Sequence, residues 1–265
     1  MLTLRSILFT TIMFVSIAPF ATLVIILRPF GQDLSYMPAL VWSRFTLWVC
    51  KILCRLDYSI EGAEHIPEKN CVVFIKHSST YETIALLKLF PRQTWVLKRE
   101  LLLTPFFGWA LACLQPIAIN RKARRAAVKQ VITQGKNRHA KGLWIMIFPE
   151  GTRMRSGETR RYGISGALLA QEANTVILPV AHNAGDFWTR RGWRKRAGTV
   201  RFVIGPPIDP TGHEPRAINE EIQRWIETKI TELRNCLYAS IQKAKLLQNF
   251  SNTILRLQPR PNLPS

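Results

Sequence analysis

The sequence has few acidic residues, and its cysteines follow no recognisable ligand spacing. Asp and Glu number 17 against 37 Lys and Arg, so the formal net charge of the 265-residue chain is +20. A charge excess of this size predicts an anionic partner, such as nucleic acid, a membrane surface or a phosphorylated substrate. The five cysteines form no CxxC pair and no Cys/His ligand pattern. This argues against a disulfide framework or a zinc module and predicts buried free thiols.

The signatures of several large enzyme classes are also missing. The chain contains no GxGxxG, no Walker-type glycine loop, no HExxH and no GxSxG. It therefore offers no motif for a dinucleotide-dependent enzyme, an NTPase, a metalloprotease or an α/β-hydrolase. With 47% hydrophobic and 20% charged residues, it is not a disordered chain either. A globular protein with a sizeable core remains.

The amino-terminal residues predict attachment to a membrane. Residues 7–27 carry no charge, and as a helix they would span about 31 Å, close to the thickness of a hydrocarbon core. Residues 34–56 mix tryptophan and phenylalanine with arginine and lysine, which is typical of a helix at a bilayer interface. Pro19 leaves open whether the first segment crosses the bilayer or bends within one leaflet and returns. More cations follow the apolar run than precede it, so the bulk of the chain is expected on the cytoplasmic side.

Short apolar runs alternate with helical stretches beyond residue 57. Six strands are predicted, at 71–76, 94–97, 115–119, 143–148, 175–180 and 199–204. Helices are predicted near 79–90, 122–139 and 163–173. Strands joined by helices predict an α/β fold, with a mostly parallel sheet and flanking helices.

A long amphipathic helix is expected near the end of the chain, from Ala217 to Gln248. Isoleucine and leucine recur there every three or four residues, which predicts a stripe that packs on the core. The predicted organisation is a membrane-anchoring helical element at 1–56, an α/β domain at 57–248 and a loose tail at 249–265.

The first candidate site lies where the strand at 71–76 ends, with His77 followed five residues later by Glu82. Ligands bind at the carboxyl ends of strands in open α/β sheets. A histidine with a nearby carboxylate can act as a general base that the acid orients. No nucleophilic Ser or Cys at a recognisable elbow accompanies the pair, so it suits direct transfer to a substrate hydroxyl. An alternative stays open, because Ser79 and Glu82 also fit a capping box for the next helix.

A second candidate site, FPEGTR at 148–153, follows another predicted strand. Gly151 allows close backbone approach, Thr152 offers a hydroxyl and Arg153 offers a guanidinium fork that suits phosphate. Arg121 follows the strand at 115–119 in a similar position. The alternative for the FPEGTR segment is an ordinary turn without a binding role.

Four ordered segments together resemble the motifs of the glycerolipid acyltransferase family. They are the His77–Glu82 segment, Ile-Asn-Arg at 119–121, FPEGTR at 148–153 and Ile-Leu-Pro-Val at 177–180. The resemblance covers roughly residues 58–210 and is nearest to the bacterial lysophosphatidate acyltransferases. It implies this family's α/β fold, with His77 as the catalytic base and Glu82 as its orienting acid. The family usually has Asp where this chain has Glu82, so the chain departs by one methylene.

The resemblance also implies the substrates. The acyl group would pass from acyl-CoA or acyl-acyl carrier protein to the sn-2 hydroxyl of lysophosphatidate and give phosphatidate, at the inner membrane of a bacterium. The implied partners are these substrates and membrane lipids, with no metal, no bound cofactor and no nucleic acid. The residues expected to bind substrate are Lys98, Arg121, Glu150, Gly151, Thr152 and Arg153.

Two alternatives to this function stay open. One is the same chemistry on another acceptor, such as a lyso-ornithine lipid or glycerol 3-phosphate. The other is a non-catalytic protein that binds membranes or nucleic acid through its charge. The basic cluster at 190–196, which surrounds Trp193, is expected to contact anionic lipid or an acidic carrier. The other histidines have no ligand spacing and are expected to be structural or solvated: His65, His139, His182 and His213.

Overall fold

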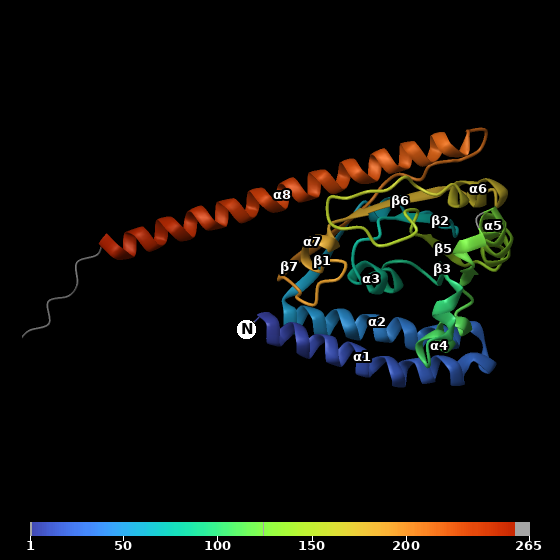
Figure 1. Cartoon of the computed structure of the whole chain (residues 1–265), viewed down its shortest axis with the longest axis horizontal. Helices are drawn as coiled ribbons and strands as arrows, with labels where there is room; N and C mark the ends of the chain where they lie inside the picture. Colours follow the sequence, from blue (N-terminus) through green and yellow to red (C-terminus); the bar gives the residue numbers. More distant parts are fainter. Residues whose placement is uncertain (1, 124, 258–265) are drawn as a thin grey trace, which may run out of the picture.

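The computed structural model describes residues 2–123 and 125–257 of the chain. A central sheet lies between two groups of helices, and a pair of amino-terminal helices runs beneath one of these groups (Figure 1). A third feature, a long carboxyl-terminal helix, crosses the opposite face of the sheet and continues beyond it (Figure 1).

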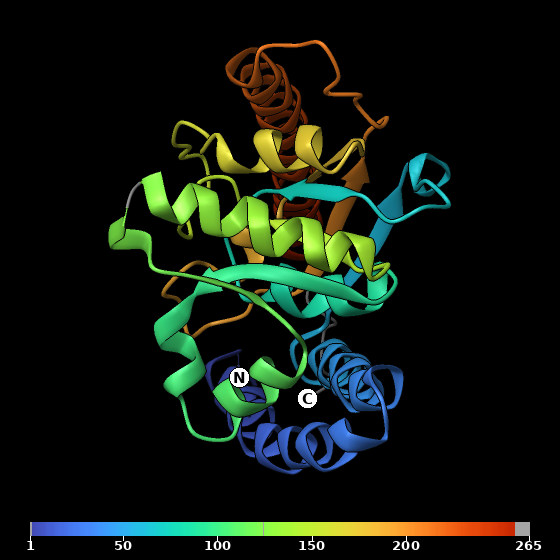
Figure 2. The same cartoon turned by 90° about the vertical axis from the view of Figure 1, so that its right-hand side faces the viewer.

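The amino-terminal element is a helical hairpin. Helix α1 (Leu2–Leu27) leads through a short 3-10 turn into α2 (Gln32–Cys54), and the two helices lie side by side (Figures 1 and 2). Both are long and apolar enough to cross a membrane by length and composition. The chain reverses at Gly31, whose φ of 127° suits glycine, and not at Pro19. Pro19 lies inside α1, where it removes one backbone donor without ending the helix.

One side of the hairpin packs on the rest of the chain and the other side is exposed. The Ser43 hydroxyl donates to the Ile84 carbonyl at 2.7 Å and so ties α2 to the next helix of the domain. Phe14 and Val15 on α1 are exposed to more than half of their surface. The hairpin therefore presents an apolar outer surface while its inner surface forms part of the core.

The sheet has seven strands in the described chain, in the order β1-β7-β6-β2-β5-β3-β4. All neighbouring pairs are parallel except β6 and β7, which are antiparallel. The strands are β1 (Leu56–Glu61), β2 (Val72–Ile75), β3 (Gln93–Lys98), β4 (Ile117–Ile119), β5 (Trp144–Ile147), β6 (Ile177–His182) and β7 (Gly198–Ile204). The predicted mostly parallel α/β fold is confirmed. β1 was missed, because its half-buried sequence LDYSIE lacks the continuous apolar run of the central strands.

The two faces of the sheet are covered by different helices. Alternate residues of β2 point to opposite faces. Val72 and Phe74 face a core shared with α5 (Arg125–Ala140), α6 (Ser165–Glu172) and α8 (Pro215–Leu257). Val73 and Ile75 face a core shared with the hairpin and with α3 (Tyr81–Leu89). Two shorter helices complete the domain, α4 (Phe107–Cys113) and α7 (Ala184–Phe187).

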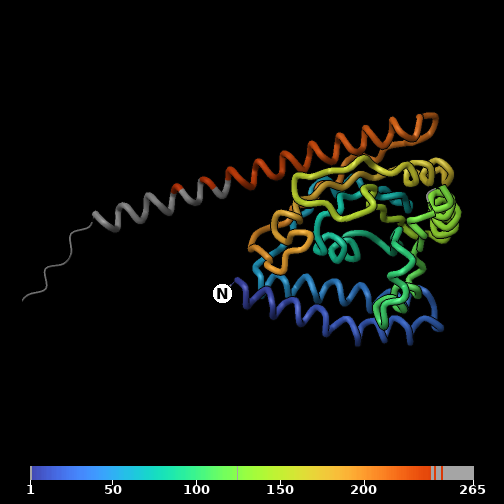
Figure 3. The backbone as a smooth tube through the Cα atoms, viewed as in Figure 1, coloured from blue at the N-terminus to red at the C-terminus, as the bar shows by residue number. Residues whose placement is uncertain are grey.

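The long helix α8 carries the predicted apolar stripe. The stripe residues are buried against the sheet as far as Leu233: Ile218, Ile222, Ile226, Ile230 and Leu233. The helix ends at Leu257, nine residues beyond the predicted boundary, so the loose tail predicted from residue 249 is wrong over that stretch. The sequence has no proline between Pro215 and Pro259 that would stop the helix earlier. Figure 3 follows the coloured part of this helix across the domain; residues 258–265 lie outside the described chain.

The cysteines only partly follow the prediction of buried thiols. Cys50, Cys54 and Cys71 are buried, whereas Cys113 is half-buried and Cys236 is exposed. The structure joins none of these five cysteines, all of which lie in the described ranges, in a disulfide.

Candidate active site

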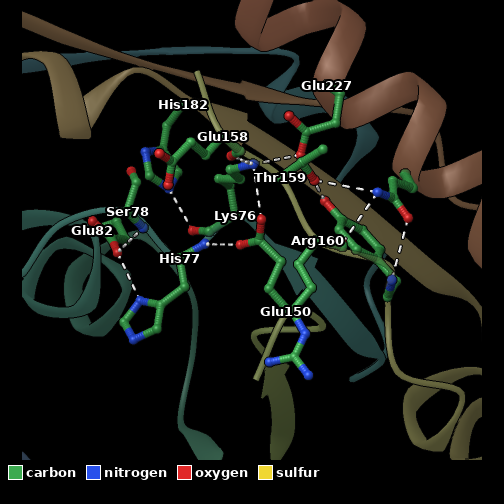
Figure 4. A network of polar contacts seen from close by, with 12 residues as sticks. Lys76, His77, Ser78, Glu82, Glu150, Glu158, Thr159, Arg160, His182 and Glu227 are labelled. Atoms are coloured by element: carbon green, nitrogen blue, oxygen red, sulfur yellow. Dashed lines mark hydrogen bonds and ion pairs between the residues drawn. The ribbon is translucent and has the colours of Figure 1, made fainter. Parts of the chain in front are cut away.

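The register of the central strands brings the two main motifs to the same level. β2 and β5 are parallel neighbours, and Phe74 is paired with Ile147. His77 and Glu150 each lie three residues beyond this pair, so they meet just past the carboxyl ends of their strands. The backbone N–H of His77 donates to Oε2 of Glu150 at 3.2 Å (Figure 4). The structure therefore joins the His77 and FPEGTR segments into one site, as the resemblance implied.

The His77 ring is held between an acid and an aromatic ring. Its Nδ1 lies 2.9 Å from Oε1 of Glu82 (Figure 4). The ring stacks on Phe148, with centroids 4.0 Å apart and an angle of 24° between the planes. The side chain is 17% exposed, whereas Glu82 is fully buried. Two constraints on one ring fix its orientation, and they leave the Nε2 edge to face a ligand.

The ionisation of Glu82 decides which nitrogen of His77 carries the proton. Burial by itself would raise the pKa of Glu82, but the hydrogen bond from His77, the nearby imidazoles and the Ser79 N–H outweigh it and lower that pKa. An ionised carboxylate can accept a hydrogen bond but has no hydrogen to donate. In the neutral imidazole, the hydrogen is therefore on Nδ1 and the lone pair is on Nε2. This is the tautomer that a general base needs.

Glu82 also caps the start of helix α3, so the structure contains both contacts that the sequence left open, the one with His77 and the one with the helix start. Its Oε1 accepts the backbone N–H groups of Ser78 at 3.0 Å and Ser79 at 2.9 Å. The Ser79 hydroxyl in turn accepts the N–H of Tyr81 at 3.1 Å. The cap and the histidine contact use the same oxygen. The start of α3 therefore fixes the position of the acid that orients His77.

A buried lysine behind His77 was missed by the sequence analysis. Nζ of Lys76 lies 2.8 Å from Oε1 of Glu150 and 2.6 Å from Oε1 of Glu227 on α8 (Figure 4). It also donates to the Glu158 carbonyl at 2.7 Å. Lys76 is 2% exposed, and a buried ammonium requires such partners. This cluster of Lys76, Glu150 and Glu227 connects the turn at His77 to the long helix α8.

The structure places Glu150 behind the mouth of the site. Its carboxylate is buried and contacts Lys76 and the backbone N–H of His77, which favours a structural role over the expected contact with substrate. Burial raises its pKa, although the Lys76 ammonium acts in the opposite direction. The sequence held one local signal, because Lys76 ends a strand that is otherwise apolar. The partner on α8 lies 151 residues away, and no local pattern could identify it.

His182 supports the same turn from the neighbouring strand. Its Nδ1 accepts the N–H of Ala184 at 3.2 Å, so its Nε2 carries the hydrogen and donates to the Lys76 carbonyl at 2.7 Å. Complete burial lowers the pKa of His182 and keeps the ring neutral. The structural role predicted for this histidine is confirmed.

The FPEGTR segment after β5 packs against the turn that contains His77. The N–H of Met154 donates to the His77 carbonyl at 2.7 Å. Gly151 has a φ of 67°, in the left-handed region that favours glycine, and no other atom would crowd a side chain there. The glycine is therefore required by the turn itself. Gly151 is exposed and Thr152 half-buried at the mouth of the site.

Arg153 and Arg121 line this mouth. Arg153 is half-buried, and its Nε has no hydrogen-bond partner among the described residues. Arg121 follows β4 and donates to the Gly151 carbonyl, so the structure brings the Ile-Asn-Arg motif to the FPEGTR turn. Unpaired guanidinium N–H groups beside an exposed backbone turn can bind phosphate.

Lys98 lies further from His77 along the same edge. It ends β3, and β5 lies between β3 and β2. At about 4.8 Å between neighbouring strands, Lys98 and His77 are separated by roughly 10 Å of sheet. Its Nζ is 3.6 Å from Oε1 of Glu100, and its side chain is 47% exposed. Among the cations of this edge, Arg153 is therefore better placed than Lys98 for a small acceptor held at His77.

The basic cluster at 190–196 is partly used inside the protein. Nζ of Lys195 donates to the Thr10 hydroxyl on α1 and to the Trp193 carbonyl, and it lies 4.6 Å from the centre of the Trp188 ring. Lys195 is 1% exposed, so the expected lipid or carrier contact is wrong for this residue. Arg191 and Arg194 remain exposed.

The site thus defines a class of enzyme before any relative is considered. An oriented histidine lies at the carboxyl edge of an α/β sheet beside cations, and among the described residues its ring is hydrogen-bonded to Glu82 and not to a serine or cysteine. In the described part of the chain, no group of three or more His, Cys, Asp or Glu residues is placed to hold a metal ion. The arrangement is suited to direct transfer of a group onto a hydroxyl of an anionic acceptor.

Comparison with known proteins identifies the family. A protein-family model described as Acyltransferase matches residues 57–183. A 1-acyl-sn-glycerol-3-phosphate acyltransferase of Pseudomonas aeruginosa is 45% identical over 195 residues, which cover 72% of this chain and 76% of the relative. The chain belongs to this acyltransferase family, and it is an enzyme of the class that its site indicates.

More distant relatives agree. The human 1-acyl-sn-glycerol-3-phosphate acyltransferase alpha is 25% identical over 207 residues, covering 77% of this chain and 72% of the relative. The crystal structure of the 1-acyl-sn-glycerophosphate acyltransferase from Thermotoga maritima matches with a TM-score of 0.73, over 87% of this chain and 95% of that chain, at 21% sequence identity. This structural match confirms the predicted fold, including the apolar helices that precede the sheet.

Proposed function

We propose that this chain transfers an acyl group to the sn-2 hydroxyl of lysophosphatidate and forms phosphatidate. The relatives named as 1-acyl-sn-glycerol-3-phosphate acyltransferases support the acceptor. The observation that carries the proposal is the contact between Nδ1 of His77 and the buried, ionised Glu82, which leaves Nε2 as the ring nitrogen that can contact a substrate at the open edge of the sheet.

Each proton and bond in the proposed reaction is accounted for. Nε2 of His77 removes the proton of the acceptor hydroxyl as its oxygen attacks the thioester carbonyl. The tetrahedral intermediate then expels the thiolate, which takes the proton back from the imidazolium. Glu82 stabilises that imidazolium without itself being protonated. The acyl donor, acyl-CoA or acyl-acyl carrier protein, is a cosubstrate, and the proposal includes no metal and no resident cofactor.

Arg153 and Arg121 bind the phosphate of the acceptor in this proposal, with Thr152 and the Gly151 backbone beside them. Their N–H groups at the mouth of the site can hold the phosphate while the hydroxyl reaches His77. Lys98 is a secondary cation at the rim.

The hairpin attaches the enzyme to the membrane in which the acceptor and product reside. The charge bias after the first apolar run favours the cytoplasmic face of the inner membrane. Since the hairpin shares buried contacts with the domain, through Ser43 and Lys195, the test requires the full chain. High salt should leave it in the membrane fraction, because salt screens charges but does not weaken an apolar anchor. Complete release by salt would contradict insertion.

The proposed reaction is tested with purified full-length protein in lipid vesicles. Lysophosphatidate and acyl-CoA, or acyl-acyl carrier protein, should yield free thiol and phosphatidate in equal amounts. A lyso-ornithine lipid and glycerol 3-phosphate serve as competing acceptors, and lysophosphatidate should have the highest kcat/KM. Faster turnover of either competitor would move the assignment to that acceptor. A failure to turn over any acceptor with either donor would contradict the proposal.

A further inference from the structure

A patch of large apolar side chains lies exposed between β3 and β4. It comprises the 3-10 segment η3 (Arg99–Leu103) and the start of α4. Leu103 is 77% exposed, Trp109 is 51% exposed and Phe106 is 49% exposed. Single exposed apolar residues are ordinary on soluble proteins, but a contiguous group marks an interaction surface. The patch is defined as Leu101, Leu103, Phe106, Phe107 and Trp109.

The backbone of the patch is built to present these side chains outward. Phe106 has φ 58° and ψ −64°, a conformation that a bulky residue rarely adopts. The Gly108 N–H donates to the Thr104 carbonyl at 2.7 Å, and a side chain at Gly108 would lie 2.5 Å from the Leu101 carbonyl oxygen. The rings of Phe106 and Trp109 are 5.6 Å apart. Unusual backbone geometry that exposes aromatic rings points to a function for the turn.

The patch is continuous with the exposed surface of the hairpin. Nε2 of Gln32, at the start of α2, donates to the Cys113 carbonyl at the end of α4, at 3.2 Å. α4 lies against the end of the hairpin where α1 turns into α2 (Figures 1 and 2). At that turn Phe30 is 72% exposed. The apolar surface of the hairpin therefore extends onto the α/β domain.

Exposed cations flank the patch along the chain. Lys98 and Arg99 come immediately before it, and Lys122 follows β4. Aromatic and apolar side chains with cations at the edge match the chemistry of a bilayer surface, where rings enter the interface and cations contact anionic headgroups. The net charge of +20 favours the same partner.

We propose that the patch enters the bilayer interface beside the hairpin, as a second membrane contact of the enzyme. This inference rests on the membrane attachment proposed above. β3 and β4, the strands on either side of the patch, end in the rim that carries Lys98 and Arg121. Seating the patch in the interface places that rim at the level of the headgroups. An acceptor can then present its phosphate to the site while its acyl chain stays in the membrane.

Quenching of tryptophan fluorescence by brominated lipid tests this contact. The full-length protein is placed in anionic phosphatidylglycerol vesicles, with or without bromine on the acyl chains, and Trp109→Phe is compared with the wild type. Phenylalanine keeps the patch apolar and aromatic. Two matched variants serve as controls, Trp48→Phe on the exposed face of α2 and Trp225→Phe on α8, where the half-buried ring lies against Gly205 on the other face of the sheet.

The measured quantity is the decrease in tryptophan fluorescence that brominated vesicles cause relative to unbrominated ones. We expect this decrease to be smaller than in the wild type for Trp109→Phe and, by a similar amount, for Trp48→Phe. For Trp225→Phe we expect the same decrease as in the wild type. If Trp109→Phe behaves like Trp225→Phe, the patch does not contact the bilayer and the inference is overturned. Shielding of the patch by a second copy of the chain would give this same negative result.

Phosphatidate formation by each variant is measured in parallel. A failure of the proposed function would abolish product in every variant, whereas a failure of this inference would appear in the quenching alone.

Discussion

Two sets of charged residues occupy the same edge of the sheet and differ in burial and in partners. Lys76, Glu82 and Glu150 are buried, and each is bonded within the protein. Arg121 and Arg153 lie at the mouth, where Arg121 is exposed and Arg153 is half-buried, with no hydrogen-bond partner for its buried Nε among the described residues. A buried charge that is already paired positions its neighbours, whereas a partly exposed cation can bind a ligand. The two sets should therefore respond to substitution in different ways.

Among variants of these two sets, Glu82→Gln should produce the largest loss of activity. The amide can still accept the backbone N–H groups that cap α3, but it no longer stabilises the imidazolium. We expect turnover to fall by on the order of 10²–10⁴-fold, as loss of an orienting carboxylate does in catalytic triads. Turnover and thermal unfolding in detergent would be measured together.

Ser79→Ala is the matched control for the capping role. It removes the hydroxyl that accepts the Tyr81 N–H, so it should cost about 1 kcal/mol of stability and little activity. Equal loss of activity in both variants would mean that Glu82 acts only through the helix start.

Lys76→Met should have the largest effect on stability. It leaves Glu150 buried without its ammonium partner, and breaking a buried pair in this way costs about 3–5 kcal/mol. The double variant Lys76→Met/Glu150→Gln should recover part of the loss, because the fully buried charge is removed and the remaining carboxylate, Glu227, is 25% exposed. Denaturant unfolding of the three proteins in detergent checks this. A double variant no more stable than Lys76→Met would argue against the ion pair as the cause.

Substitutions of Arg153 test the second set, the cations at the mouth of the site. Arg153→Lys should raise the KM for lysophosphatidate, and Arg153→Ala should raise it further, while the KM for the acyl donor changes less. A lost charge-assisted hydrogen bond contributes about 1.5–3 kcal/mol, which is roughly ten- to a hundredfold. Lys98→Ala, at the far rim, should change this KM less than Arg153→Ala does. A larger effect at Lys98 would move the phosphate away from Arg153.

The smallest predicted effect concerns pH and His182. Its folded pKa is lowered by burial, so below the ordinary value of 6.5 the unfolded chain binds a proton that the folded chain does not. The stability due to the neutral ring is therefore present above that value and is lost as the pH falls. His182→Gln should flatten the decrease in melting temperature between about pH 6.5 and 5. An unchanged slope would show that His182 is not the group responsible.

How much could be predicted from the sequence depends on the distance along the chain between the groups that interact. The central strands, the stripe of α8 and the His77–Glu82 pair arise from residues a few positions apart, and they were predicted. The inward orientation of Glu150 depends on Lys76, and the partner of Lys76 on α8 lies 151 residues away. The burial of Lys195 against α1 likewise depends on a contact across 185 residues. Such contacts exist only after the chain has folded, so residue types and local spacing did not reveal them.

The central claim is that Nε2 of His77, oriented by Glu82, removes the proton of the acceptor. The most direct measurement is the turnover of His77→Ala with lysophosphatidate and acyl-CoA, on protein whose melting temperature matches the wild type. We predict a loss of at least ~10²-fold in kcat, the usual effect of removing a general base. A folded His77→Ala variant with near-normal kcat would contradict the assignment and make His77 a structural residue.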